Sequence, residues 1–138
     1  MKYLLDTHAL IWLMSDQDSE LPQQLIDSLL YYEDDFFISE ISLVEIIQLQ
    51  QIGRVVLNRP NTVRRAVNAN GIKIIPISSD ILETFYDLPI FSINGNRHTD
   101  PFDRIIISTA IKRGLTLVSR DGKFPAYTSK SGLSLMSI

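Results

Sequence analysis

Residues 3–14, YLLDTHALIWLM, decide the fold because they join a short buried strand to a helix through one acid. Residues 3–5 form an apolar run of the length typical of a buried strand. Asp6 ends that run, and the apolar residues 9–14 favour a helix. The chain is therefore expected to open with a strand that leads directly into a helix, with an acid at the junction.

The alternation of strands and helices continues along the chain. Helices are expected over residues 22–32, 39–52, 60–70 and 101–114, with a further helix capped by Ser79 or Asp80, and strands over residues 36–38, 72–77, 115–118 and 133–138. Residues 89–100 contain Pro89 and the pair Asn94-Gly95, which predict a loop. Strands separated by helices imply right-handed crossovers. The predicted fold class is therefore α/β, a mostly parallel sheet with helices on both faces.

The length and composition are those of one domain that folds on its own. The chain has 138 residues, of which 45% are hydrophobic and 21% charged, and a chain of this size buries roughly 70% of its unfolded surface. It contains no cysteine, which fits a reducing compartment and excludes disulfides, thiolate catalysis and cysteine-based zinc sites. No apolar run approaches the ~18 residues that span a bilayer. We therefore expect a cytoplasmic protein with no membrane segment.

The charge of the chain is unevenly distributed. The net charge of −3 does not by itself indicate a protein that binds nucleic acid, but twelve of the thirteen lysines and arginines lie within residues 54–138. A basic surface patch is therefore compatible with the acidic total. The alternative is that folding scatters these residues over the surface.

Two acids follow predicted strands. Asp6 closes the first strand, and Asp121 comes shortly after the strand over residues 115–118. Parallel sheets bind ligands in the crevice beyond the carboxyl ends of their strands, so both acids lie where chemistry tends to occur. Taken singly, each could equally be a turn residue or a helix cap.

Glu45 is an unexpected acid within an apolar helix face. At 100° per residue its neighbours on the helix surface are Ile41, Leu49 and Ile52, so it is expected in the middle of an apolar stripe. A carboxylate there is costly to bury unless it is paired or coordinates a metal. The alternative to a metal is an ion pair, for which the candidate partners are Arg54, Arg64 and Arg65.

Asp103 repeats this pattern on the helix that begins at Pro101. Its angular neighbours are Ile107, Ala110 and Gly114, a row of apolar and small residues that is expected to face inward. Asp100 has a simpler interpretation, because an Asp-Pro pair at a helix start is an N-cap followed by proline at the first helical position. A role for Asp100 beside the metal ligands is the alternative.

Four acids in one pocket would repel one another strongly unless a cation joined them. With no cysteine available, oxygen ligands favour Mg²⁺ or Mn²⁺ over zinc or copper. Mg²⁺ keeps several waters and binds few protein carboxylates together with substrate phosphate. Asp6, Glu45, Asp103 and Asp121 therefore predict a metal site suited to hydrolysis of a phosphodiester.

Four stretches carry a resemblance to a known family. They are LLDTHALIWL (residues 4–13), SEISLVEI (residues 39–46), HTDPFDRIIISTA (residues 98–110) and TLVSRDGKF (residues 116–124). In order and spacing they resemble the motifs of PIN-domain ribonucleases, particularly the VapC-like toxins of bacterial toxin–antitoxin pairs. The resemblance runs to about Tyr127 and implies a single PIN-like domain over residues 1–138, a three-layer sandwich with about four to five strands.

The resemblance also assigns residues and activity. It implies Mg²⁺- or Mn²⁺-dependent cleavage of RNA, with Asp6, Glu45, Asp103 and Asp121 as catalytic residues and metal ligands. Thr7 and Ser119 match hydroxyl positions that in the family help to hold water or metal, and His98 with Asp100 belongs to the longer version of the third motif. Residues 92–98, SINGNRH, match no family pattern, and substrate preference is one role open to them.

A mechanism and partners follow from the same resemblance. The hypothesis is that Asp6, Glu45 and Asp103 hold one Mg²⁺, directly or through water, while Asp121 completes the site or helps a second ion. Attack by water in line with the leaving group would give a 5′-phosphate and a 3′-hydroxyl. The implied partners are an RNA substrate, a cognate antitoxin and a second copy of the chain in a homodimer.

Two alternatives remain open. His8 or His98 could act as a general base in a ribonuclease that needs no metal. The chain could also be a PIN-fold binding protein that acts through partner association with little or no nuclease activity. A partner segment would lie in a groove lined by aromatic residues such as Trp12, Tyr31, Tyr32 and Phe36, although core packing is the expectation for most of them.

Overall fold

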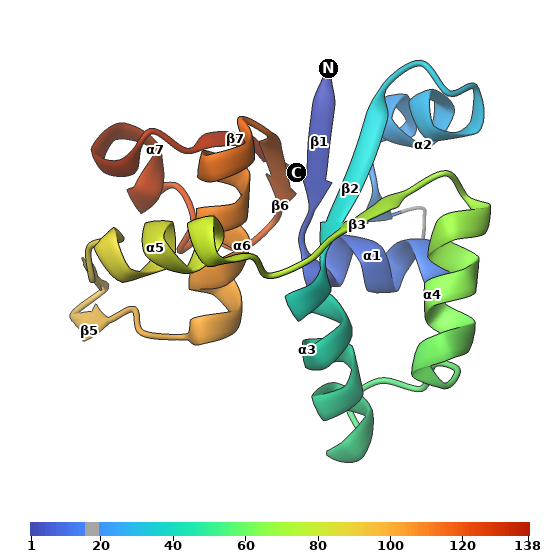
Figure 1. Ribbon diagram of the computed structural model, residues 1–138, viewed down its shortest axis with the longest axis horizontal. Helices are drawn as coiled ribbons and strands as arrows, with labels where there is room; N and C mark the ends of the chain where they lie inside the picture. Colours follow the sequence, from blue (N-terminus) through green and yellow to red (C-terminus); the bar gives the residue numbers. More distant parts are fainter. Residues whose placement is uncertain (16–19) are drawn as a thin grey trace.

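A five-stranded sheet forms the centre of the molecule in a computed structural model that describes residues 1–15 and 20–138 (Figure 1). The strands are β1 (Lys2–Leu5), β2 (Asp35–Ser39), β3 (Lys73–Ile75), β6 (Thr116–Ser119) and β7 (Ser134–Ser137). They lie in the order β3-β2-β1-β6-β7, and every neighbouring pair is parallel. The predicted α/β fold class is confirmed, and the sheet is parallel throughout.

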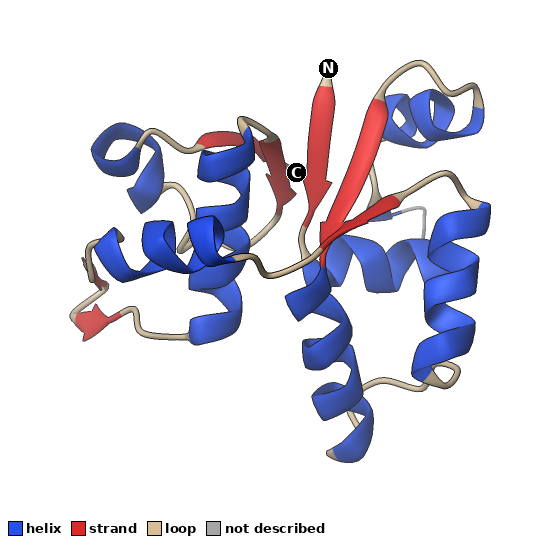
Figure 2. Cartoon of the chain, in the orientation of Figure 1, coloured by secondary structure: helices blue, strands red, loops and turns tan. Residues whose placement is uncertain are grey.

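Helices cover both faces of this sheet, as the three-layer prediction requires. They are α1 (Thr7–Met14), α2 (Gln23–Leu30), α3 (Glu40–Gln51), α4 (Pro60–Ala69), α5 (Ser79–Asp87), α6 (Pro101–Arg113) and α7 (Ala126–Ser131). Figure 2 shows α1, α2 and α4 on one side of the strands and α5, α6 and α7 on the other. None of the helices described is long and apolar enough to cross a bilayer.

The apolar run in β1 is explained by these two layers. Tyr3 and Leu5 pack into the cluster under α1, α2 and α4, whereas Leu4 packs into the cluster under α5 and α6. Successive side chains of a strand point to opposite faces of the sheet, and here both faces are covered. No position in residues 3–5 therefore faces water, which is why the run contains no charged residue.

The strand order places a crevice at the end of β1. The chain continues from β1 to β2 and β3 on one side, whereas β6 and β7 lie on the other. The connections thus proceed to one side of β1 first and to its other side later, although β1 and β6 are parallel. Such a change in the order of connection is a topological switch point, where open parallel sheets bind ligands. The amide of Asp6 donates to the carbonyl of Val118 at 3.1 Å, so the acid stands at the mouth of this crevice.

Residues 89–100 differ from the prediction, because they include a small antiparallel hairpin. Its strands are β4 (Ser92–Ile93) and β5 (Asn96–Arg97). Asn94 and Gly95 form the turn with φ values of 52° and 81°, the pair of positive values that a type I′ turn needs. Two strands of two residues each carry too little alternation of apolar and polar residues to be recognised in a sequence.

Two further differences concern helices. Helix α7 was not predicted, because its six residues, AYTSKS, are short and mostly polar. Helix α3 has the predicted position, but it runs beyond the end of the sheet (Figure 1), so its last turn has no sheet to pack against. Ile52, expected on the apolar stripe, is consequently 59% exposed.

Leu4 is the residue through which we test this arrangement. Its side chain is fully buried at the centre of the sheet, so Leu4→Ala is expected to lower the free energy of unfolding by about 2–5 kcal/mol. Leu30→Ala, at a position 63% exposed, is the matched control and is expected to change it by less than about 0.5 kcal/mol. Urea denaturation measures both, and equal losses would contradict the layered core.

Candidate active site

A pocket of about 650 Å³ lies at the switch point and collects the predicted acids. Its lining includes the acids Asp6, Glu45, Asp100, Asp103 and Asp121, together with Thr7. The rest of its wall includes Ile11, Trp12, Leu49 and Val55, with His8, Arg54 and Lys123 as further lining residues. The structure thus brings all four predicted acids to one cavity, although they come from positions 6 to 121 of the sequence.

Asp6 is buried and serves two neighbours at once. Its Oδ1 accepts from the backbone amide of Ala9 at 2.8 Å, which caps α1. Its Oδ2 accepts from the hydroxyl of Ser119 at 2.5 Å. Burial raises the pKa of Asp6, although the Ser119 hydroxyl and the Ala9 amide lower it in part. Both oxygens of the carboxyl group are therefore held by hydrogen bonds, while its raised pKa means that it loses its proton less readily than a carboxyl group in water.

Ser119 joins the acids at the two strand ends. It is the last residue of β6, and its side chain is buried. Besides donating to Asp6, its hydroxyl oxygen accepts from the backbone amide of Asp121 at 3.1 Å. Asp121 also accepts from the amide of Lys123 at 2.9 Å and pairs with its ammonium at 3.1 Å. The hydroxyl of Ser119 therefore holds β1 and the turn after β6 in a fixed relation.

Glu45 lies at the edge of the apolar face of α3, so its predicted place in the middle of the stripe is wrong. The buried residues of α3 are Ile41, Ser42, Leu43 and Ile46, whereas Glu45 is half-buried and lines the pocket. Burial raises the pKa of Glu45, the nearby Thr7 hydroxyl lowers it, and Asp103 raises it further. Thr7 itself donates to Ser42 at 3.1 Å.

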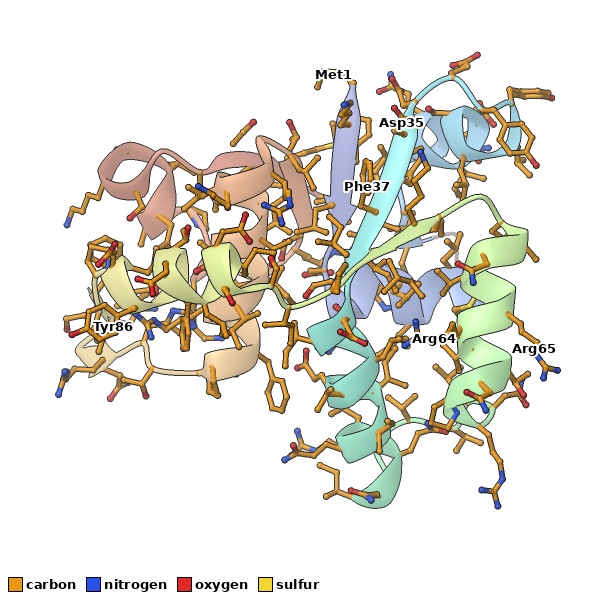
Figure 3. The ribbon with its side chains drawn as sticks, in the orientation of Figure 1. Met1, Asp35, Phe37, Arg64, Arg65 and Tyr86 are labelled. Carbon is orange, nitrogen blue, oxygen red and sulfur yellow. The ribbon has the colours of Figure 1, made fainter. Side chains whose placement is uncertain are left out.

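The ion pair proposed as an alternative for Glu45 does not form among the described residues. Arg64 pairs instead with Glu40, at 3.5 Å. Figure 3 shows Arg65 pointing away from the body of the protein on the outer side of α4. Arg54 lines the pocket with Glu45 but forms no ion pair with it in the described part of the chain. The carboxylate of Glu45 therefore lines the pocket without a neutralising arginine among the described residues.

Asp103 projects from the first turn of α6 toward the same cavity and is half-buried. Its Oδ2 lies 3.0 Å from Nε2 of the buried His98. Burial raises the pKa of Asp103, His98 lowers it, and Asp100 and Asp121 raise it. Gly114, expected on the same inward row, instead ends the helix in the left-handed conformation with φ of 65°.

Asp100 acts as the N-cap of α6. Its Oδ1 accepts from the amide of Phe102 at 2.9 Å, and Pro101 follows at the first helical position. The side chain is exposed and also lines the pocket that contains the other acids. The cap predicted from the Asp-Pro pair is therefore present, and it does not remove Asp100 from the neighbourhood of the other acids.

Several contributors to the site were not predicted from the sequence. Ser42 supports Thr7, Lys123 pairs with Asp121, and the hydroxyl of Tyr127 lies 2.7 Å from Nδ1 of His98. The spacing of Lys123 two residues after Asp121 was a usable signal, because Asx turns bring such residues together. The contact between Tyr127 and His98 joins positions 29 residues apart and had no local signal.

Three of the arginines are engaged by other groups of the protein. Arg113 pairs with Asp80, Arg120 pairs with Glu20 and Arg104 is buried with its guanidinium on the carbonyl of Leu88. The guanidinium of Arg120 also lies over the Trp12 ring, 4.5 Å from its centroid. These arginines are occupied within the protein, which reduces the number available to phosphate.

The donor set fits a hard divalent cation. All four predicted ligands would bind a metal through carboxylate oxygens. Three of these carboxyl groups have raised pKa values, and a nearby cation would lower them again. Among the described residues, no group of three acids or histidines is close enough to hold an ion directly. Mg²⁺ fits such a spacing, because it retains waters and needs only one or two protein carboxylates.

Comparison with known proteins identifies the family of the chain. The sequence model of the PIN domain matches residues 3–130. No curated protein matches the chain in sequence. Thus the family assignment rests on the domain model, which covers nearly all of the chain.

Solved structures share the fold at low sequence identity. VapBC2 from Rickettsia felis, bound to a DNA fragment from its promoter, is 18% identical with a TM-score of 0.71, and the match covers 99% of this chain and 98% of that one. VapBC-1 from nontypeable Haemophilus influenzae is 17% identical with a TM-score of 0.65 over 99% and 98%. FitAcB from Neisseria gonorrhoeae is 21% identical with a TM-score of 0.63 over 98% and 96%.

The raised pKa of Glu45 predicts that this acid destabilises the protein without metal. The folded state holds its proton more tightly than the unfolded chain does, so the free energy of unfolding falls as pH rises from the ordinary value of 4.5 through the raised value. Glu45→Gln is therefore expected to be more stable than the parent at pH 7 in EDTA.

The measurement is urea denaturation from pH 3.5 to pH 8. The advantage of Glu45→Gln should shrink as the pH is lowered from the raised value toward 4.5, because the folded parent then carries a neutral carboxyl as well. Glu83→Gln, on the exposed surface of α5, is the matched control and should show no such dependence. An equal or lower stability of Glu45→Gln at pH 7 would contradict this account.

Proposed function

This chain belongs to the PIN-domain family, whose members are generally nucleases, and from that premise we propose that it is a Mg²⁺- or Mn²⁺-dependent endoribonuclease of the VapC-like toxin class. The observation that carries the proposal is the gathering of Asp6, Glu45, Asp103 and Asp121 around one pocket at the switch point. Three of these acids have pKa values raised chiefly by burial, and proteins keep such costly groups where function needs them.

The ion would be held by Asp6, Glu45 and Asp103, at most two of them directly and the rest through water, with Asp121 completing the site. When bound, a divalent cation lowers the pKa of the attacking water and stabilises charge on the phosphate. The residues of the chain then have distinct tasks. Ser119 orients Asp6 and Asp121 through hydrogen bonds at 2.5 and 3.1 Å, and Thr7 adds a hydroxyl to the pocket wall. Asp100 holds the start of α6, from which Asp103 projects.

Hydrolysis at this site would proceed by attack of water on the phosphorus in line with the leaving 3′-oxygen. The products would be a 5′-phosphate and a 3′-hydroxyl. Asp121 and Asp100 line both the main pocket and a second cavity beside the β4–β5 hairpin, so Asp121 is, of the four proposed ligands, the one best placed to meet substrate. That second cavity also contains Arg97 and Lys123, two cations suited to the phosphates of a bound strand.

We further propose that a cognate antitoxin binds in this pocket against its apolar lining. Ile11, Trp12, Leu49 and Val55 contribute that lining, and the four acids line the same pocket. A partner helix or extended segment lying there could direct a cationic side chain toward the carboxylates. A toxin–antitoxin complex from Klebsiella pneumoniae shares the fold, as does VapBC-5 from Mycobacterium tuberculosis, a member of the VapBC family of toxin–antitoxin systems, which supports this kind of partner.

The aromatic residues considered for the antitoxin groove divide into three kinds. Phe36 is buried in the core, as expected for most of the four. Tyr31 and Tyr32 are 72% and 76% exposed, so the core expectation is wrong for them. Trp12 is half-buried and lines the pocket. A homodimer belongs to the same proposal and rests on the family alone. A cytoplasmic location and a single PIN-like domain over residues 1–138 also belong to it, supported by the composition and length of the chain.

Asp6→Asn tests the role of the acids with the least change in shape. The amide oxygen can still accept from Ala9, so α1 keeps its cap, but the negative charge is lost. We expect RNA cleavage in Mg²⁺ to fall by about 100-fold or more, the scale of removing one preorganised electrostatic group from an active site. Asp87→Asn, at an exposed position of α5, is the control and should cleave normally. Undiminished cleavage by folded Asp6→Asn would refute the proposed site.

The metal-free mechanism through His8 or His98 is distinguished by chemistry at the scissile nucleotide. A histidine base would use the RNA 2′-hydroxyl as nucleophile, whereas attack by water does not need it. We expect EDTA to abolish cleavage, Mg²⁺ or Mn²⁺ to restore it, and an RNA with a single 2′-deoxy substitution at the cut position to remain a substrate. Cleavage that persists in EDTA and is lost with the 2′-deoxy substrate would favour the histidine mechanism.

The alternative of a binding protein without nuclease activity predicts a different pattern. In that case no RNA cleavage would appear with either ion, while association with a partner would be unchanged by Asp6→Asn. Purified protein and mass spectrometry of the cleaved ends therefore separate the two functions. A 5′-phosphate on the downstream fragment is the expected product.

A further inference from the structure

We propose that His98 and Tyr127 are positioning residues that hold the carboxylate of Asp103 in the orientation needed to receive a divalent cation. The inference rests on the proposed function, because it gives Asp103 the role of a metal ligand. It concerns a buried chain of hydrogen bonds that runs from Tyr127 through His98 to Asp103. These three residues come from different elements, namely α7, the segment after β5, and α6.

The series of hydrogen bonds from Tyr127 to Asp103 is continuous and largely buried. The Tyr127 hydroxyl lies 2.7 Å from Nδ1 of His98, and Nε2 of the same ring lies 3.0 Å from Oδ2 of Asp103. Tyr127 is fully buried and His98 is 5% exposed, whereas the side chain of Asp103 reaches the pocket. Both ring nitrogens of His98 are therefore occupied, and one of them is committed to a proposed metal ligand.

The direction of each hydrogen bond follows from the chemistry of the partners. An ionised carboxylate only accepts, so Nε2 of His98 must carry the hydrogen that it donates to Asp103. In the neutral ring Nδ1 is then an acceptor, and the Tyr127 hydroxyl donates to it. Tyr127 thereby selects the tautomer that can serve Asp103, as the outer partner of a metal-bound carboxylate or histidine does in other metal sites.

The surrounding contacts prevent the His98 ring from turning. The backbone amide of His98 donates to the carbonyl of Phe91 at 2.8 Å. The ring of Phe91 packs edge-on against Tyr127 with centroids 4.8 Å apart, and the rings of His98 and Tyr127 meet at 5.6 Å. The residues just before and after the hairpin are therefore packed around α7, which explains why this short helix is part of the site.

The consequence for Asp103 is that its two oxygens become different. Oδ2 is held by His98, while Oδ1 receives no hydrogen bond from the residues that the structure describes. A carboxylate fixed at one oxygen presents the other in a defined direction, which reduces the ordering that ion binding would otherwise require. Loss of these hydrogen bonds would leave the carboxylate of Asp103 free to rotate in a pocket that it shares with the three other proposed ligands.

Binding of Mn²⁺ to the full-length protein, measured by isothermal titration calorimetry without RNA, is the direct test. His98→Leu removes the donor and is expected to weaken Mn²⁺ affinity by about 10- to 100-fold. Tyr127→Phe removes only the hydroxyl and is expected to weaken it by about 10-fold. His98→Gln, whose amide nitrogen can reach the place of Nε2, is expected to recover most of the affinity lost in His98→Leu.

Steady-state kinetics of RNA cleavage at saturating Mn²⁺ provide a second readout. We expect kcat to fall in Tyr127→Phe with KM nearly unchanged, because the hydroxyl does not contact substrate. Tyr3→Phe is the matched control, since it removes the hydroxyl of another buried tyrosine in the opposite core layer. It should bind Mn²⁺ and cleave RNA like the parent.

The outcomes separate this inference from the proposed function. Parent-like Mn²⁺ affinity in folded Tyr127→Phe and His98→Leu would overturn the positioning role and leave the nuclease proposal standing. A His98→Gln variant as impaired as His98→Leu would overturn the role of the Nε2 donor. If His98→Leu fails to fold, Tyr127→Phe decides the question. No Mn²⁺ binding by the parent protein would refute the metal site itself.

Discussion

The gathering of carboxyl groups against their mutual repulsion is the constraint on which the rest of this structure depends. Burial raises the pKa of Asp6, Glu45 and Asp103, so ionising them in the folded protein costs free energy. Hydrogen bonds to the carboxyl groups reduce that cost in part, chiefly those from Ser119 to Asp6 and from His98 to Asp103. The pocket therefore combines an unfavourable charge arrangement with a rigid setting, a combination typical of sites that await a cation.

The sheet supplies the rigid setting. Two acids follow strands on either side of the switch point, and two project from helices that pack against the same edge. Side chains carried by strands and helices are held more closely than side chains on loops, because their backbones are fixed by packing and by hydrogen bonds. The apolar core around β1 therefore contributes to the site as well as to stability, since any shift of this strand would move Asp6 relative to Asp121.

Particular residues show how far the sequence could be interpreted. Asp6 and Asp121 were located correctly, because a buried strand followed by an acid is a local pattern and parallel strands end at one edge. Glu45 lies in the expected pocket, but at the edge of the apolar face of its helix and not in the middle. The prediction of a central place assumed that α3 packs along its whole length, whereas α3 runs past the sheet and leaves Ile52 exposed. The hairpin over residues 92–97 and helix α7 escaped prediction, because both are short and their residues lack a clear period.

By itself, the sequence determined the α/β class, the order of the main elements and the four acids that line the pocket, since strand patterns, helix caps and motif spacing are local properties. Only the tertiary structure decided how those acids are supported. Ser119 reaches Asp6 across 113 residues and Tyr127 reaches His98 across 29, and such contacts have no signature in a single sequence because their partners meet only after folding. The same physical reason applies to Glu45, whose half-buried place at the pocket depends on where α3 leaves the sheet.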